Sequence, residues 1–176
     1  MSTSVGFMQE GSDEERRAAF IDSLTNNALN QSRSEALDVY QRYLGLRPSK
    51  NKRFNIIELV KSGLPLSAGK TLAGHIGVEM KTFFTVYVGM SDSTMRRRLK
   101  EQMALSVDES DRVVRYAHLL SLATQLMEGS EEDAREWLAS SSPALGGATP
   151  LETATTEAGA RRVEDLIVSL EYGMFS

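Results

Sequence analysis

Capping boxes at four places along the 176-residue chain constrain its fold more than any other feature. In a capping box, a Ser or Thr just before the helix accepts a hydrogen bond from the third helical amide, while an acid at that third position reaches back to the cap amide. Each pair here stands just before apolar residues at helical spacing. The pairs are Ser12 with Glu15, Ser32 with Glu35, Ser106 with Glu109, and Thr149 with Glu152. The sequence therefore predicts an all-α fold.

Apolar periodicity, together with the positions of Gly and Pro, predicts where the longer helices lie. The expected helices cover residues 13–30, 33–44, 55–61, 67–75, 79–88, 107–127, 131–139 and 157–172. The segment 79–88 contains the run TFFTVYV, whose β-prone residues would also suit a strand. Its apolar side chains nevertheless follow the helical spacing i, i+3, i+4 and i+7, namely Phe83, Val86, Tyr87 and Met90. In the last helix the expected buried face is Val163, Leu166, Ile167 and Leu170.

The chain is predicted to divide into three parts. Residues 1–50 form an N-terminal helical unit that ends in a polar linker at 47–53. Residues 51–128 form a central helical bundle with a helix-turn-helix, and residues 129–176 form a C-terminal helical domain. Helix-turn-helix proteins normally bind DNA as dimers, so a homodimer is expected. The apolar faces of the N-terminal helices are the candidate for self-association, and the alternative is that they pack on the central bundle.

The segment Glu79 to Gln102 has the parts of a helix-turn-helix in order: a support helix, a turn at Gly89, and a second helix. Met95 and Leu99 lie four apart and are expected to face the core. The second helix carries the densest basic cluster of a chain whose net charge is −4. The predicted DNA-binding residues are Ser91, Ser93, Thr94, Arg96, Arg97, Arg98 and Lys100. The alternative is that the three arginines pair with acids such as Asp108, Glu109 and Asp111.

Neither a catalytic nor a metal-binding set is evident in the sequence. The chain has no cysteine, which excludes disulfides, thiolate nucleophiles and Cys-based zinc sites. Its two histidines, His75 and His118, sit within apolar helical patterns and are expected to be buried or half-buried structural residues. The run Gly69-Lys70-Thr71 lacks the preceding glycine that a phosphate loop requires. We therefore expect no enzymatic activity, no metal and no cofactor.

Targeting signals are likewise not apparent. No apolar stretch approaches the ~20 residues that span a bilayer, and the first residues lack the pattern of a secretory signal. A cytoplasmic protein without a membrane partner is expected.

The last forty residues carry the most specific pattern, PALGG followed by TPLE, then a helix of mixed charge that ends in Glu171-Tyr172-Gly173-Met174-Phe175-Ser176. This segment resembles the toxin-binding domain of the Xre/MbcA/ParS antitoxin family, and residues 59–127 resemble its Xre-like helix-turn-helix more loosely. The resemblance implies an antitoxin whose partner is a RES-domain toxin, a class that attacks NAD or uses it for ADP-ribosylation. It also implies that the C-terminal segment occludes the toxin's active site, and that the antitoxin represses its own operon by binding operator DNA. The toxin-contacting residues implied are Trp137, Leu145, Gly146, Gly147, Pro150, Arg161, Glu164, Glu171, Tyr172, Gly173, Phe175 and Ser176.

The end of the chain is expected to enter a pocket of the toxin, because a short apolar tail is poorly solvated. The competing interpretation is that Tyr172 and Phe175 pack back on the protein's own core. A second function also fits the pattern: a helix-turn-helix transcription regulator whose C-terminal domain senses a small ligand.

Overall fold

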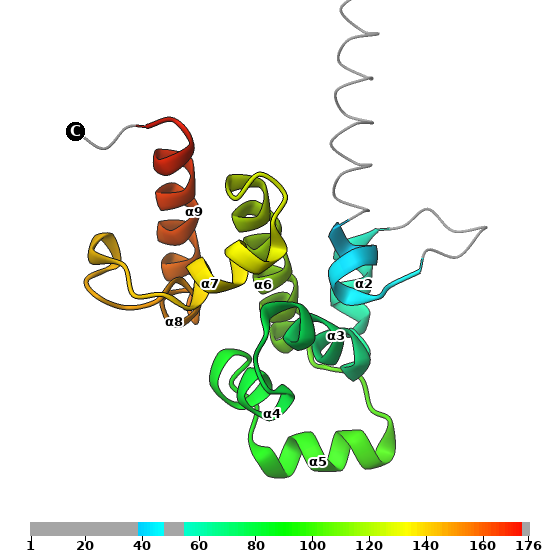
Figure 1. Ribbon diagram of the computed structural model, residues 1–176. Helices are drawn as coiled ribbons and strands as arrows, with labels where there is room; N and C mark the ends of the chain where they lie inside the picture. The colour runs from blue at the N-terminus through cyan, green and yellow to red at the C-terminus, as the bar shows by residue number, and fades with distance from the viewer. Residues whose placement is uncertain (1–38, 48–54, 174–176) are drawn as a thin grey trace, which may run out of the picture. The chain divides into compact units, whose positions relative to one another are not determined.

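The computed structural model describes residues 39–47 and 55–173, all of which belong to one compact unit (Figure 1). The predicted helix at 13–30, the first two capping boxes and the residues after Gly173 lie outside the described part. The prediction that residues 1–50 mediate self-association therefore stays a prediction.

All regular elements in the described part are helical, which confirms the all-α prediction. Residues 39–44 are helical, and the elements that follow are α2 (Ile56–Ser62), α3 (Leu66–Ile76), α4 (Met80–Thr82), the π-helix η1 (Phe83–Tyr87), α5 (Asp92–Glu101), α6 (Val107–Leu126), α7 (Glu131–Ala139), the 3₁₀ helix η2 (Pro143–Leu145), α8 (Pro150–Thr153) and α9 (Glu157–Glu171). The predicted ends of the helices from α2 onward agree with these bounds to within one residue.

Helix α6 is the element around which the other helices pack. Its buried face contains Val113, Tyr116 and Leu120, at the helical spacing that the sequence predicts. The helix contacts α2 and α3 on the one hand and α7 and α9 on the other. The buried residues of α3, α6, α7 and α9 form one cluster, and the partly buried Leu59 of α2 packs against it. The Tyr116 hydroxyl donates a hydrogen bond of 3.0 Å to the carbonyl of Leu151, at the start of the C-terminal helices. The predicted boundary at 128/129 thus falls in a short turn whose two sides share a core.

The predicted capping boxes at the starts of α6 and α8 both form. At α6, the Glu109 amide donates to the Ser106 hydroxyl at 3.3 Å, and the Ser106 amide donates to the Glu109 carboxylate at 2.7 Å. The same carboxylate binds the Arg98 guanidinium. Burial raises the pKa of Glu109, but the hydrogen bonds from the Ser106 amide and the Arg98 guanidinium lower it more, so the pKa lies below its usual range.

The β-prone segment is helical as predicted, and Phe83 and Met90 of its predicted apolar stripe are buried, but Val86 is not. The Val88 amide donates a hydrogen bond of 3.0 Å to the Phe83 carbonyl, an i→i+5 bond of a π-helix. This wider turn rotates the following side chains away from the 3.6-residue period on which the prediction relied. Phe84 and Val88 are fully buried, whereas Val86, predicted to face the core, is 55% exposed.

A close approach between α3 and η1 explains a glycine in the middle of α3. A Cβ atom placed on Gly69 would lie 2.5 Å from Cζ of the buried Phe84 ring. Gly74, on the same helix, has open space at the corresponding position. The absence of a side chain at Gly69 is therefore what allows the aromatic ring of η1 to lie against the backbone of α3.

Substituting the two glycines of α3 with alanine should have opposite effects. Gly69→Ala is expected to lower the free energy of unfolding by about 1–3 kcal/mol, because the Phe84 ring must move. Gly74→Ala, the matched control, should raise it by about 0.5–1 kcal/mol through helix propensity alone. Urea unfolding of the two variants gives the comparison. Equal effects at the two sites would contradict the close packing of Phe84 on Gly69.

Neutralising Glu109 should remove stability in a pH-dependent way. Folding lowers the pKa of the Glu109 carboxyl. Its charged form therefore stabilises the fold fully at pH values above the pKa of a Glu in the unfolded chain, ~4.3. This stabilisation is lost as the pH falls through the lower pKa of the folded state. Glu109→Gln is expected to lower the free energy of unfolding by about 1–3 kcal/mol at pH 7. Urea titrations at neutral and strongly acidic pH should show this deficit shrinking at the acidic pH. A deficit of the same size at both would show that the charge of Glu109 does not stabilise the fold.

Candidate functional site

A tight turn joins η1 to α5, as the sequence predicts for a helix-turn-helix. Gly89 has a φ of +78°, in the left-handed region that favours glycine. Ser91 then caps α5: its hydroxyl accepts from the Thr94 amide at 3.2 Å and donates to the Thr94 hydroxyl at 2.8 Å. Ser91 and Thr94, both predicted to contact DNA, therefore hold the start of the helix.

The exposed face of α5 is basic. Ser93, Arg96, Arg97 and Lys100 are all exposed on it. Arg96 forms an ion pair of 2.9 Å with Asp92 one turn earlier, with its own side chain 72% exposed. Within the described residues, no ion pair engages Arg97 or Lys100. These side chains are placed where an anionic ligand can reach them.

Two residues of α5 lie differently from the prediction. The Arg98 side chain is largely buried and is bound to Glu109 of α6, so the alternative interpretation, an ion pair with a following acid, is correct for this arginine. The prediction that Arg98 belongs to the exposed DNA-binding set is wrong for this reason. Leu99, predicted to face the core, is 45% exposed, and Met95 is the buried residue of the helix.

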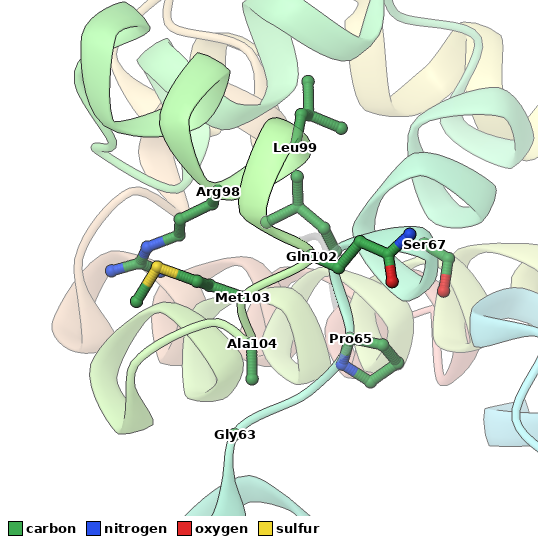
Figure 2. Close-up of a pocket in the computed structure, with 9 residues that line it drawn as sticks. Gly63, Pro65, Ser67, Arg98, Leu99, Gln102, Met103 and Ala104 are labelled. Carbon is green, nitrogen blue, oxygen red and sulfur yellow. The ribbon is translucent and has the colours of Figure 1, made fainter.

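A concavity of about 460 Å³ lies between the end of α5 and the start of α3 (Figure 2). Leu99, Gln102 and Met103 line it from α5 and the loop that follows, and Pro65 and Ser67 line it from the beginning of α3. Leu99 is exposed because its side chain lines this concavity and does not pack into the core.

The loop of the PALGG pattern is held by hydrogen bonds within the C-terminal helices. The Ser142 amide donates to the Ala148 carbonyl at 3.0 Å, and the Arg162 guanidinium on α9 donates to the Ala144 carbonyl at 2.9 Å. Gly146 and Gly147 have φ values of +71° and +88°, and neither has another atom within 4 Å of the position of a Cβ. The loop thus presents bare backbone to its surroundings.

Three of the residues implied as toxin contacts have side chains turned wholly or partly into the fold. Leu145 is 7% exposed and Pro150 is buried, and both pack in the core that α9 closes. Trp137 on α7 is half-buried against the same core. Because their side chains are occupied internally, Leu145 and Pro150 hold the loop in place and offer little surface to a partner.

The outer face of α9 is exposed up to its last turn. Arg161 is exposed and pairs with Glu157 at 3.3 Å, while Glu164 lies 4.0 Å from His118. Glu171, Tyr172 and Gly173 are exposed. Phe175 and Ser176 lie outside the described residues.

An exposed apolar pair at the end of α9 went partly unpredicted. Tyr172 is 72% exposed, so the interpretation that it packs on the protein's own core is wrong for this residue. Val168, one turn before Tyr172, is 46% exposed, and Leu170, predicted to be buried, is 39% exposed. The i, i+4 spacing of Val168 and Tyr172 was the signal that could have identified Val168.

The two histidines take different positions. His75 is partly buried, and its Nδ1 lies 2.8 Å from the Glu131 carboxylate, as expected of a structural residue. His118, expected to be buried or half-buried, has 51% of its side chain exposed, because it projects from α6 toward α9 beside Glu164. Among the described residues, no three His, Asp or Glu side chains are arranged to hold a metal ion. The described helices also include none with the length and apolar character needed to cross a bilayer.

Two family models match successive parts of the chain. Residues 56–118 match the antitoxin Xre-like helix-turn-helix domain. Residues 122–173 match the antitoxin Xre/MbcA/ParS C-terminal toxin-binding domain. The two matches meet within α6 and cover the basic face of α5 and the exposed face of α9.

Curated relatives carry related names. The chain is 32% identical over 80 residues to the "Antitoxin Xre" of Pseudomonas putida, a match that covers 46% of this chain and half of that protein. It is 28% identical over 129 residues to the "Antitoxin Xre" of Yersinia enterocolitica, covering 65% of this chain and 87% of the relative. It is 28% identical over 128 residues to the "Prs ADP-ribosylating antitoxin" of a Sphingobium species, covering 68% and 80%. With its helix-turn-helix and its C-terminal helices each matched in this order, the chain belongs to the Xre/MbcA/ParS family of antitoxins.

Proposed function

We propose that this protein is the antitoxin of a toxin–antitoxin pair. Its C-terminal helices bind a RES-domain toxin and block the site at which that toxin consumes NAD or transfers ADP-ribose. Its helix α5 binds the operator of the gene pair and represses transcription, with the protein acting as a cytoplasmic homodimer. The family assignment supports this role, and the name of the Sphingobium relative connects an antitoxin with ADP-ribosylation. The role is one of binding, and it requires no catalytic residue and no cofactor of the protein's own.

The apolar end of α9 carries the toxin-binding part of the proposal. Val168 and Tyr172, four residues apart, expose large apolar side chains on one face at the end of α9, and Leu170 between them exposes another on a different face. Exposed apolar side chains that gather in one place are typical of protein–protein interfaces, and Tyr is among the residues that contribute most to them. The bare loop at Gly146 and Gly147 belongs to the same matched region and would let a partner approach the backbone.

Removing the aromatic ring at the end of α9 should weaken binding to the toxin. Tyr172→Ala is expected to reduce affinity by about tenfold or more, the loss typical of an interface aromatic residue, without changing stability, since the side chain is 72% exposed. Ile57→Ala is the matched control, because Ile57 is 62% exposed on α2, within the helix-turn-helix match. Binding to the toxin encoded beside this gene is measured by calorimetry, and neutralisation by growth of cells that express both proteins. Full protection and unchanged affinity with Tyr172→Ala would refute this role of α9.

The basic face of α5 supports the DNA-binding part of the proposal. Arg97 and Lys100 project from the helix that follows the turn, the helix that enters the major groove in helix-turn-helix proteins. Ser93 lies near the start of the same helix, where a hydroxyl suits a contact with a phosphate or base edge. The net charge of −4 is no obstacle, because the positive charge is concentrated on this one face.

Neutralising α5 should weaken DNA binding in a salt-dependent way. Arg97→Gln and Lys100→Gln are each expected to lower affinity for the DNA upstream of the gene and to reduce the slope of log affinity against log salt by about one. Lys61→Gln, which removes the same charge from an exposed position on α2, is the control and should leave the slope unchanged. Fluorescence anisotropy over a salt series measures this. Slopes that are the same for all three variants would exclude α5 as the DNA-binding helix.

A further inference from the structure

Few apolar contacts hold α5 in place. Of its ten residues, Met95 is the buried one, and Leu99, which the helical spacing would also place inside, stands exposed at the wall of a groove. A helix with so little buried apolar surface gains little orientation from packing. Its direction must therefore depend on polar contacts at its ends.

The first of these contacts joins the second half of α5 to the start of α6. The Arg98 guanidinium binds the Glu109 carboxylate, and the two side chains are 14% and 13% exposed. Glu109 is itself fixed by the capping box, since it accepts the Ser106 amide at 2.7 Å. The ion pair therefore anchors Arg98 to a carboxylate that is itself held by the backbone at the start of α6. Because both side chains are largely buried, solvent weakens this ion pair less than it weakens ion pairs on the surface.

The second contact holds the turn before α5. The Arg112 guanidinium donates a hydrogen bond of 2.5 Å to the Val88 carbonyl, the residue just before Gly89. A Cβ on Gly89 would lie 3.2 Å from the same guanidinium nitrogen, so the arginine lies directly against the turn. Glu109 and Arg112 are three residues apart and share one face of α6. One face of α6 thus holds the turn before α5 through Arg112 and the second half of α5 through Glu109.

From these contacts we propose that Glu109 and Arg112 are positioning residues for DNA recognition: they fix the angle at which α5 presents Ser93, Arg97 and Lys100, without touching DNA themselves. The inference rests on the proposed DNA-binding function. Base recognition depends on the exact placement of a few side chains, whereas attraction to phosphates depends mainly on charge. Removing the contacts of Glu109 and Arg112 should therefore reduce the affinity of the protein for the operator and leave its affinity for unrelated DNA unchanged.

The sign of the effect separates positioning from electrostatics. Glu109→Gln removes a negative charge beside the basic helix, so on charge alone it would strengthen binding to any DNA. Positioning predicts the reverse for the operator: a loss of about tenfold in affinity, with binding to a scrambled duplex unchanged or stronger. Asp108→Asn is the matched control, because it removes the same charge from the neighbouring exposed position on α6 and should not weaken binding. Operator affinity that is equal in Glu109→Gln and Asp108→Asn would overturn the proposal.

A measurement without DNA keeps the test independent of the proposed function. Hydrogen exchange should show a larger loss of protection in Glu109→Gln than in Asp108→Asn for the α5 amides, and this loss should exceed the one that global destabilisation causes in the amides of α3 and α9. Equal protection of α5 in the two variants would overturn the positioning role. If Glu109→Gln does not fold, Arg98→Lys takes its place, since it keeps the charge and loses the planar guanidinium; the same selective loss on α5 is expected, and its absence counts against the proposal. A wild-type chain that binds operator and scrambled DNA equally would refute the proposed function, while the exchange data would still decide whether α6 holds α5.

Discussion

The burial of one face of α6 is the constraint on which the described structure depends. Val113, Tyr116 and Leu120 fill the centre of a core to which helices before and after α6 contribute. The Tyr116 hydroxyl reaches the backbone at Leu151, so the helix contacts the C-terminal segment by a hydrogen bond as well as by packing. At its start, the capping box places Glu109 where Arg98 can bind it. A helix that buries this much of its surface and is fixed at its beginning can orient elements at both of its ends.

The two functional parts of the family therefore share structure instead of being joined by a linker. The matches to the helix-turn-helix domain and to the toxin-binding domain meet inside α6, at residues 118 and 122. Helix α5 is gripped by the first turns of α6, and α9 packs on the same helix. In the proposed function, a toxin bound at α9 and DNA bound at α5 would thus be held by one compact body, with an arrangement set by the length and direction of α6.

Local signals in the sequence were enough to predict the helices. Ser106 with Glu109 and Thr149 with Glu152 marked two helix starts, and apolar spacing gave the buried face of α6. The sequence was less informative about which residue each side chain contacts in the folded protein. Arg98 looked like one of three equivalent arginines, because only folding brings Glu109, eleven residues later, to its guanidinium. Val86 followed a regular helical stripe, and the π-helix at 83–87 shifted it outward. Leu145, implied as a toxin contact, is buried in the core, and Leu170, predicted to be buried, is 39% exposed, because burial in a loop and exposure at a helix end depend on the whole core.

The claim that α6 unites the described helices into one cooperative unit can be tested directly by hydrogen exchange of the full chain at increasing urea concentration. Amides in the middle of α3, on the helix-turn-helix side, and in the middle of α9, on the C-terminal side, are compared peptide by peptide. If they share one core, both groups should lose protection at the same urea concentration and with the same free energy of opening, equal to that of α6. Loss of protection in α9 at clearly lower urea than in α3 and α6 would show two independent domains and contradict the account.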